Sequence, residues 1–116
     1  MARPHESLDA WRHAMRLVKT VYLITRRFPR EEMYGLASQM RRAAVSIPSN
    51  LAEGAARSTR KEFAKFISIS MGSLSELETQ ALIASELSYI PPHHEIFIHL
   101  ERVAQLLYGL QRNVLG

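Results

Sequence analysis

The sequence predicts an all-α protein: an antiparallel, up-down-up-down bundle of four helices in a single domain, residues 1–116. Three observations support this prediction. Apolar residues recur at spacings of three and four in four separate segments. Proline- or glycine-containing connections divide these segments, and none of them shows the alternation of a strand. At 116 residues, of which 47% are hydrophobic, the chain can bury one core.

The first helix is expected to begin at Ser7, whose hydroxyl can cap it, and to end at Phe28, just before Pro29. Its core face follows the spacing 3-4-3-4-3 through Trp11, Ala14, Val18, Val21, Thr25 and Phe28. A short connection over residues 30–35 then leads to the second helix.

The second helix is expected to contain a proline. Its apolar stripe consists of Leu36, Met40, Ala43, Ile47, Leu51 and Ala55. An interior proline removes one backbone hydrogen bond and costs roughly 3 kcal/mol, so the helix either breaks in two or bends. Because the apolar spacing stays in phase across Pro48, we expect one long helix kinked at that residue.

The third helix is expected to start at a capping box formed by Thr59 and Glu62, and to continue to about Tyr89. A glycine inside a helix costs about 1 kcal/mol relative to alanine. Gly72 therefore indicates a close approach between helices.

The fourth helix is expected directly after Pro91 and Pro92, with His93 and His94 in its exposed first turn. Its core stripe has the spacing 4-3-4-3-4 and consists of Ile96, Leu100, Val103, Leu107, Leu110 and Val114. Several of the four helices have apolar stripes wider than one buried seam requires. We therefore expect the protein to form a homo-oligomer.

Charge is distributed unevenly along the chain. Residues 1–65 hold 13 Lys and Arg against 6 Asp and Glu, a net charge of +7. Residues 66–116 hold 2 against 5, a net charge of −3. This asymmetry is typical of a nucleic-acid-binding surface, and equally of subunits that dock a basic face on an acidic one.

Several chemistries are not supported by the sequence. The chain has no cysteine, which excludes disulfides and thiol catalysis. A di-metal carboxylate site needs Glu-x-x-His twice, and the motif is absent, as are a nucleophile elbow and a phosphate-binding glycine loop. No apolar run approaches the roughly 18 residues that span a bilayer, and residues 1–7 lack an apolar signal core. We expect a non-enzymatic, cytoplasmic protein without metal, cofactor or membrane contact.

A polar line runs beside the apolar stripe of the second helix. Ser46, Asn50 and Glu53 are spaced i, i+4 and i+7, and so share one helical face. Ser73 and Glu76 on the third helix could face them across the bundle. The five side chains form either a structural hydrogen-bonded network or a pocket for a small ligand or metal. We favour the network, because buried polar groups must be paired.

The candidate nucleic-acid-binding residues are Arg57, Arg60, Lys61 and Lys65 at the second turn, with Arg12 and Arg16 of the first helix. In an up-down bundle this turn and the start of the first helix lie at the same end. The only aromatic residues beside the turn, Phe63 and Phe66, are required by the core. Any nucleic-acid contact is therefore expected to be made with phosphates and not by base stacking.

Several of these motifs together resemble a known family. They are Phe28-Pro29, Gly35-Leu36, residues 39–54 with their Ser-Ile-x-x-Asn-x-Ala-Glu-Gly core, residues 63–66, and residues 72–78. The chain is similar over nearly its whole length to the 23S rRNA intervening-sequence proteins, with Leu51 in place of the expected isoleucine and Ser70 in place of a small apolar residue. The resemblance implies a four-helix bundle assembled as a homopentameric ring, with no known catalytic activity.

A related protein is the accessory subunit of diversity-generating retroelements, which partners a reverse transcriptase and binds nucleic acid. The resemblance therefore implies RNA or DNA, and a reverse transcriptase or other nucleic-acid enzyme, as partners. The leading hypothesis is a non-enzymatic oligomer that binds structured RNA or DNA through its basic surface. The alternative is an assembly or protein-interaction module that does not bind nucleic acid.

Overall fold

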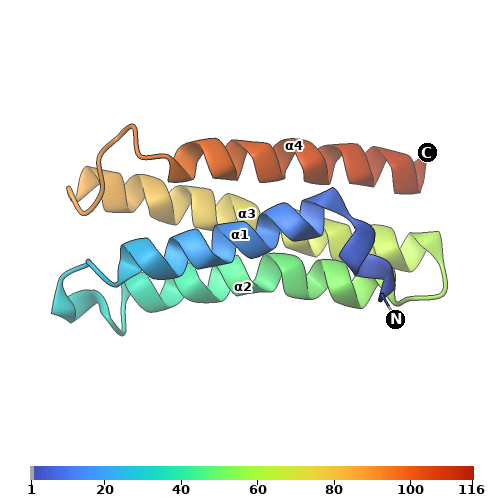
Figure 1. Ribbon diagram of the computed structural model, residues 1–116, viewed down its shortest axis with the longest axis horizontal. Helices are drawn as coiled ribbons and strands as arrows, with labels where there is room; N and C mark the ends of the chain where they lie inside the picture. The colour runs from blue at the N-terminus through green and yellow to red at the C-terminus, as the bar shows by residue number, and fades with distance from the viewer. Residues whose placement is uncertain (1) are drawn as a thin grey trace.

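The computed structural model describes residues 2–116 (Figure 1). Within this range there are four α-helices and no strand: α1 (Asp9–Thr25), α2 (Leu36–Ala55), α3 (Arg60–Glu86) and α4 (Ile96–Leu115). Two 3₁₀ turns, η1 (Pro4–Ser7) and η2 (Arg30–Glu32), precede α1 and α2. Met1, the first residue of the predicted domain, lies outside the described residues. The prediction of an all-α protein with four helices is confirmed.

Consecutive helices run in opposite directions (Figure 1). Helices α1 and α3 each pack against both α2 and α4, so that the four helices enclose one core. The molecule measures 44 × 23 × 22 Å. Both chain termini lie at the end that carries the α2–α3 connection, which we call the turn end (Figure 1). The α1–α2 and α3–α4 connections lie at the opposite end, which we call the loop end (Figure 1).

The core face of α1 is rotated relative to the prediction. Leu17 is fully buried, whereas Trp11 and Val18 are only partly buried. The helix begins at Asp9 without a side-chain cap, because Ser7 belongs to η1 and donates its hydroxyl to the carbonyl of Pro4. The helix also ends earlier than predicted, at Thr25, after which the backbone tightens into i→i+3 hydrogen bonds.

Helix α2 passes through Pro48 without interruption, so the alternative of two short helices is wrong. The proline ring is buried. The predicted stripe is also found in the core, where Met40, Ile47 and Leu51 are fully buried. The apolar phase on either side of Pro48 therefore indicated the continuity of the helix correctly.

The Thr59 half of the predicted capping box is present: the hydroxyl of Thr59 accepts the backbone N–H of Glu62 at 3.1 Å. The carboxylate of Glu62 accepts from the hydroxyl of Thr59 at 3.2 Å, and not from its backbone N–H. The helix ends at Glu86, three residues before the predicted Tyr89. Ser88 adopts a φ of 63°, and the N–H of Tyr89 returns to the carbonyl of Ala84 at 2.8 Å. This is a Schellman ending, with serine at the left-handed position that glycine usually occupies. Because no glycine marks this position, the end of the helix at Glu86 could not be located from the sequence.

The close helix approach expected at Gly72 is found at Gly54 instead. A Cβ atom at Gly72 would meet no heavy atom within 4 Å. At Gly54 it would lie 2.6 Å from Cβ of Phe66 and 3.1 Å from Cδ1 of Phe63. Gly54 is buried, and its missing side chain lets α2 and α3 meet at the turn end.

Helix α4 starts at Ile96 and not directly after the two prolines. The prediction that His93 and His94 form an exposed first turn is therefore wrong. Both residues precede the helix, and His94 is half-buried. The ring Nδ1 of His94 accepts the N–H of Ile96 at 3.0 Å, so that it satisfies one of the free donors at the start of α4.

Candidate nucleic-acid interface

The second-turn cations lie on the surface of the turn end. Arg57 follows the end of α2, and Arg60, Lys61 and Lys65 occupy the first two turns of α3. All four are exposed. The Thr59 cap fixes where α3 begins, and the Gly54 contact fixes how closely it lies against α2. The cluster is therefore displayed from two packed helices and not from a long loop.

These cations differ in how they are held. The guanidinium of Arg57 lies 3.8 Å from a carboxylate oxygen of Glu53 and 5.0 Å from the centroid of the Phe66 ring. In the described chain, no carboxylate lies within 4.0 Å of Arg60, Lys61 or Lys65. Three cations are thus free to meet phosphates, whereas Arg57 is partly neutralised and oriented by its neighbours.

The two cations predicted on α1, Arg12 and Arg16, also differ in how they are held. Figure 1 shows the N-terminal segment beside the α2–α3 turn, and η1 packs on α2. Arg12 is held in place, because it forms an ion pair with Asp9 and donates to the carbonyl of Glu6 at 2.9 Å. Arg16 is exposed, and no ion pair of the described residues includes it.

Three of the five predicted polar residues are joined by hydrogen bonds. The hydroxyls of Ser46 and Ser73 lie 2.8 Å apart, linking α2 to α3. The amide Nδ2 of Asn50 donates to the carbonyl of Ser46 at 2.8 Å and to its hydroxyl at 3.0 Å. A fourth link was not predicted: Ser70 is buried and donates to the carbonyl of Ile47 at 2.9 Å. The departure from a small apolar residue at position 70 therefore adds one more bond between α2 and α3.

The two glutamates are not joined to this group by hydrogen bonds. Glu53 is exposed and pairs with Arg57, just after the end of the same helix. Glu76 is exposed and accepts from Gln80, on its own helix, at 3.5 Å. Glu76 does line an open groove of about 460 Å³ that runs over Ser46 and Ser73 between α2 and α3. The polar line is thus a helix-to-helix seam with a shallow groove above it.

Two grooves at the loop end were missed by sequence reasoning. One, of about 510 Å³, lies between the end of α1 and the α3–α4 connection, and Arg26, Arg27 and His94 are among its lining residues. The other, of about 630 Å³, lies between α1 and α2 and includes Tyr22, Met33, Tyr34 and Arg41. Tyr34 is 92% exposed. The one sequence signal for the second groove was Tyr34, an aromatic residue in a connecting segment and outside every helical stripe.

The two loop-end connections are linked to each other. The Tyr89 hydroxyl donates to a carboxylate oxygen of Glu32 at 2.8 Å, and the Tyr89 ring packs on Phe28 with centroids 5.1 Å apart. The hydrogen bond to Glu32, followed by burial and by the charges of Glu32 and Glu31, raises the pKa of Tyr89. Glu32 also accepts the N–H of Leu36 with its other carboxylate oxygen, and so ties the start of α2 to this contact.

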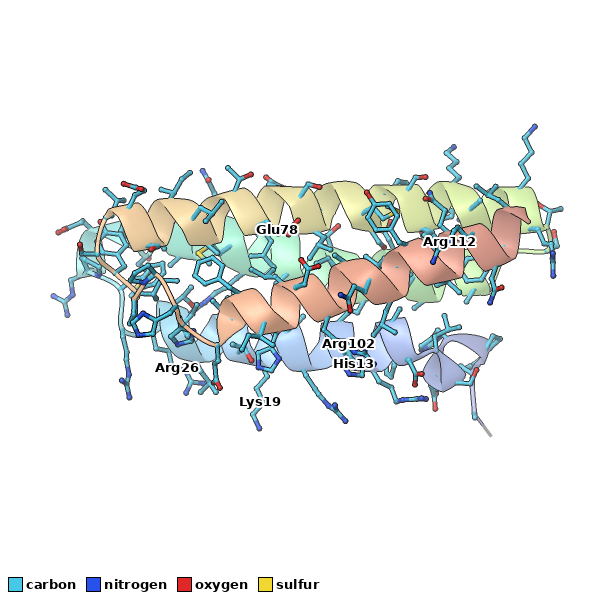
Figure 2. The ribbon with its side chains drawn as sticks, turned by 90° about the horizontal axis from the view of Figure 1, so that it is seen from above. His13, Lys19, Arg26, Glu78, Arg102 and Arg112 are labelled. Atoms are coloured by element: carbon cyan, nitrogen blue, oxygen red, sulfur yellow. The ribbon has the colours of Figure 1, made fainter. Side chains whose placement is uncertain are left out.

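The acidic half of the chain carries one perturbed carboxyl. Glu78 lies on α3 beside α4 (Figure 2). Burial, with a smaller contribution from the charge of Glu101, raises the pKa of Glu78 above its ordinary value. Glu78 therefore binds its proton more readily in the folded protein than in the unfolded chain.

Within residues 2–116, no three His, Asp or Glu side chains lie together in a way that could hold a metal ion. None of the described helices combines the length and the apolar character that crossing a bilayer requires.

The comparisons with known proteins identify a family. A search of curated proteins found no match to this chain. A family model described as "23S rRNA-intervening sequence protein" matches residues 6–109, which include all of α1, α2 and α3 and most of α4. Together with the four-helix fold, this match confirms the resemblance carried by the Ser-Ile-x-x-Asn-x-Ala-Glu-Gly core. The chain belongs to the family of 23S rRNA-intervening sequence proteins.

Proposed function

We propose that this protein is a non-enzymatic, cytoplasmic homo-oligomer that binds structured RNA or DNA through the basic surface of its turn end. The observation that carries the proposal is the group of exposed cations without carboxylate partners, Arg60, Lys61 and Lys65. Membership of a family named for an intervening sequence in ribosomal RNA supports the choice of nucleic acid as the ligand.

The proposed contact is made with phosphates. Lys and Arg that neutralise phosphates release condensed counterions, which gives affinity without reading the sequence of bases. The aromatic residues of the turn end are occupied in packing, since Phe63 and Phe66 both lie against the backbone at Gly54. The turn end therefore offers charge without a stacking surface.

We further propose a homopentameric ring of kinked bundles, with the bend of α2 at Pro48. A ring would repeat the turn-end cations around one rim and multiply weak phosphate contacts, because linked sites bind with a high effective concentration. Such a rim would suit an accessory of a reverse transcriptase or of another enzyme that acts on nucleic acid.

The direct test measures binding of a fluorescein-labelled RNA hairpin of about 16 base pairs by fluorescence anisotropy at several salt concentrations. Each phosphate contact adds about 0.9 to the slope of log affinity against log salt. We expect micromolar or tighter binding at low salt, and we expect the Lys61→Gln/Lys65→Gln variant to lower the slope by about 2.

The matched control is Lys19→Gln/Arg102→Gln, which removes the same charge from exposed positions on α1 and α4, away from the turn (Figure 2). It should leave the slope nearly unchanged. Equal losses in both variants would show that the turn end is not the binding surface. No binding of RNA or DNA hairpins at low salt would overturn the proposal altogether.

A second candidate function is an assembly or protein-interaction module without nucleic-acid binding. It is favoured by large apolar side chains exposed on α3 and α4, including Leu82, Ile83 and Ile98. In this case the turn-end cations dock on the acidic half of a neighbouring subunit. Reversing Arg57, Arg60 and Lys61 to glutamate would then dissociate the oligomer, which light scattering measures as a fall in molar mass.

A further inference from the structure

The groove between α1 and α2 at the loop end is unlike the turn-end surface. It has a volume of about 630 Å³, within the range of ligand pockets. Its lining combines aromatic, apolar, hydroxyl and cationic side chains: Tyr22, Met33, Tyr34, Ser38, Arg41, Arg42, Val45 and Ser46. Two of these residues are arginines and none is a carboxylate. The groove thus carries positive charge next to aromatic rings.

Arg41 is held in a fixed orientation in this groove. Its Nε donates to the hydroxyl of Thr25 at 2.8 Å, and its guanidinium carbon lies 4.7 Å from the centroid of the Tyr22 ring. The Thr25 hydroxyl in turn donates to the carbonyl of Val21 at 2.7 Å. Among the described residues, no carboxylate lies within 4.0 Å of Arg41, although the side chain is half-buried.

The charge of Arg41 is balanced by no carboxylate of the described residues, so its guanidinium is available to an anion that enters the groove. Its two Nη atoms, which make no hydrogen bond within the described chain, can form the paired contacts that phosphate oxygens accept. Arg42 is exposed, also lines the groove, and adds a second cation. The groove is therefore complementary in charge to a phosphate group.

Tyr34 supplies the other half of the recognition. Its side chain is 92% exposed, in the connection that precedes α2, and Met33 beside it is 55% exposed. An aromatic ring open on its faces next to an arginine is the arrangement on which unpaired bases stack. A paired base inside a duplex could not reach the ring in this way, because its own faces are already stacked.

We propose that this groove binds an unpaired nucleotide, with the base stacked on Tyr34 and the phosphate held by Arg41 and Arg42. The inference rests on the proposed function and deepens it, because it specifies the kind of nucleic acid: a structured segment with a single-stranded segment next to it. A peptide is the poorer fit, because the groove offers two cations and would need an acidic partner of matching shape.

The test uses fluorescein-labelled oligoadenylate of about 12 nucleotides, a single-stranded probe whose bases stack well. Base stacking on one aromatic ring accounts for about 5- to 100-fold in affinity. We expect Tyr34→Ala to lose that factor, Tyr34→Phe to retain affinity, and Arg42→Gln to reduce the salt dependence. Tyr108→Ala is the matched control, because Tyr108 is also an exposed tyrosine, on α4 and outside the groove.

A site-specific readout comes from Tyr34→Trp, whose exposed indole should be quenched when oligoadenylate binds, with the partly buried Trp11 as an internal reference. Unchanged affinity in Tyr34→Ala, or equal losses in Tyr34→Phe and Tyr34→Ala, would overturn the inference. A change in molar mass of Tyr34→Ala without a change in oligoadenylate affinity would also overturn it, because the groove would then be a protein interface.

Failure of this inference can be told apart from failure of the proposed function. If hairpin binding depends on Lys61 and Lys65 but oligoadenylate binding does not depend on Tyr34, only the single-strand site is wrong. If the wild-type protein binds neither the hairpin nor oligoadenylate, both proposals are wrong.

Discussion

The two ends of the bundle carry positive charge in different settings. At the turn end, residues 56–59 connect α2 to α3, and Gly54 brings the two helices into contact. At the loop end, the connections cover residues 26–35 and 87–95; one groove lies between the end of α1 and the second connection, and another between α1 and α2. A short connection displays cations on a packed surface, whereas longer ones also expose aromatic rings. Under the proposed function, the turn end would contact phosphates alone, whereas the loop end would add a contact with a base.

The largest expected effect tests whether the loop end is held together by its aromatic contact. Phe28 is buried and packs on Tyr89, so that it joins the two connections. Phe28→Ala should lower the free energy of unfolding by about 3–5 kcal/mol, measured by urea denaturation. Tyr34→Ala, which removes an exposed ring from the same connection, should change it by less than about 0.5 kcal/mol. Similar losses in the two variants would contradict the assigned role of Phe28.

The next effect tests the packing of the turn end. Gly54→Ala places a Cβ atom 2.6 Å from Cβ of Phe66, so we expect a loss of about 1–3 kcal/mol in the free energy of unfolding. Gly72→Ala is the matched control, because nothing lies near its Cβ position and α3 gains a better helix former. Gly72→Ala should therefore stabilise the protein by about 0.5–1 kcal/mol. If both alanines are stabilising, α2 and α3 are not in close contact at Gly54.

A smaller effect is expected midway between the ends, in the seam of α2 and α3. Ser73→Ala removes the hydrogen bond to Ser46 and should cost about 1 kcal/mol of unfolding free energy. Ser75→Ala, at an exposed position of the same helix, should have almost no effect. If Ser73→Ala abolished hairpin binding without loss of stability, the seam would be a binding site and not a structural network.

The smallest effect concerns Glu78, in the acidic half of the chain, residues 66–116. Burial and Glu101 raise the pKa of Glu78, so the folded state binds the proton more tightly. Its contribution to stability is therefore most favourable in acid, and it becomes unfavourable as the pH rises through that raised pKa. Glu78→Gln should slightly raise the melting temperature at neutral pH and bring no gain in acid. Glu86→Gln, with the same charge loss at an exposed position of α3, is the control, and an equal rise there would contradict the assignment.

Most of the fold could be predicted from the sequence because apolar spacing records which helical face is buried. The stripe of α2 stays in phase through Pro48, and the Thr59 cap marks the start of α3. The errors lie at helix ends, where residues without the usual capping preference take the capping positions. Ser88 takes a left-handed conformation without being glycine, and His94 accepts the N–H of Ile96 just before α4, although the prediction placed it inside the helix.

The candidate site was predictable only in part. Spacing places Ser46, Asn50 and Ser73 together, but it does not show that Glu53 and Glu76 make their contacts elsewhere, with Arg57 and Gln80. Equally, no local pattern shows which of two glycines meets a neighbouring helix, or that Tyr22 and Arg41 pack together across α1 and α2. Such pairings depend on the rotation of each helix about its axis. Side chains of adjacent residues leave a helix in widely different directions, so this rotation decides which of them meet.

The position of the termini has a practical consequence. Both lie at the turn end, beside the cations of the α2–α3 connection (Figure 1). A bulky fusion partner or a polyhistidine tag at either terminus would therefore shield or mimic that surface in a binding assay. The α3–α4 connection, residues 87–95 at the loop end of the 44 Å molecule, is the place for a fluorescent label or a surface tether (Figure 1). An immobilised protein attached there would present its turn end outward.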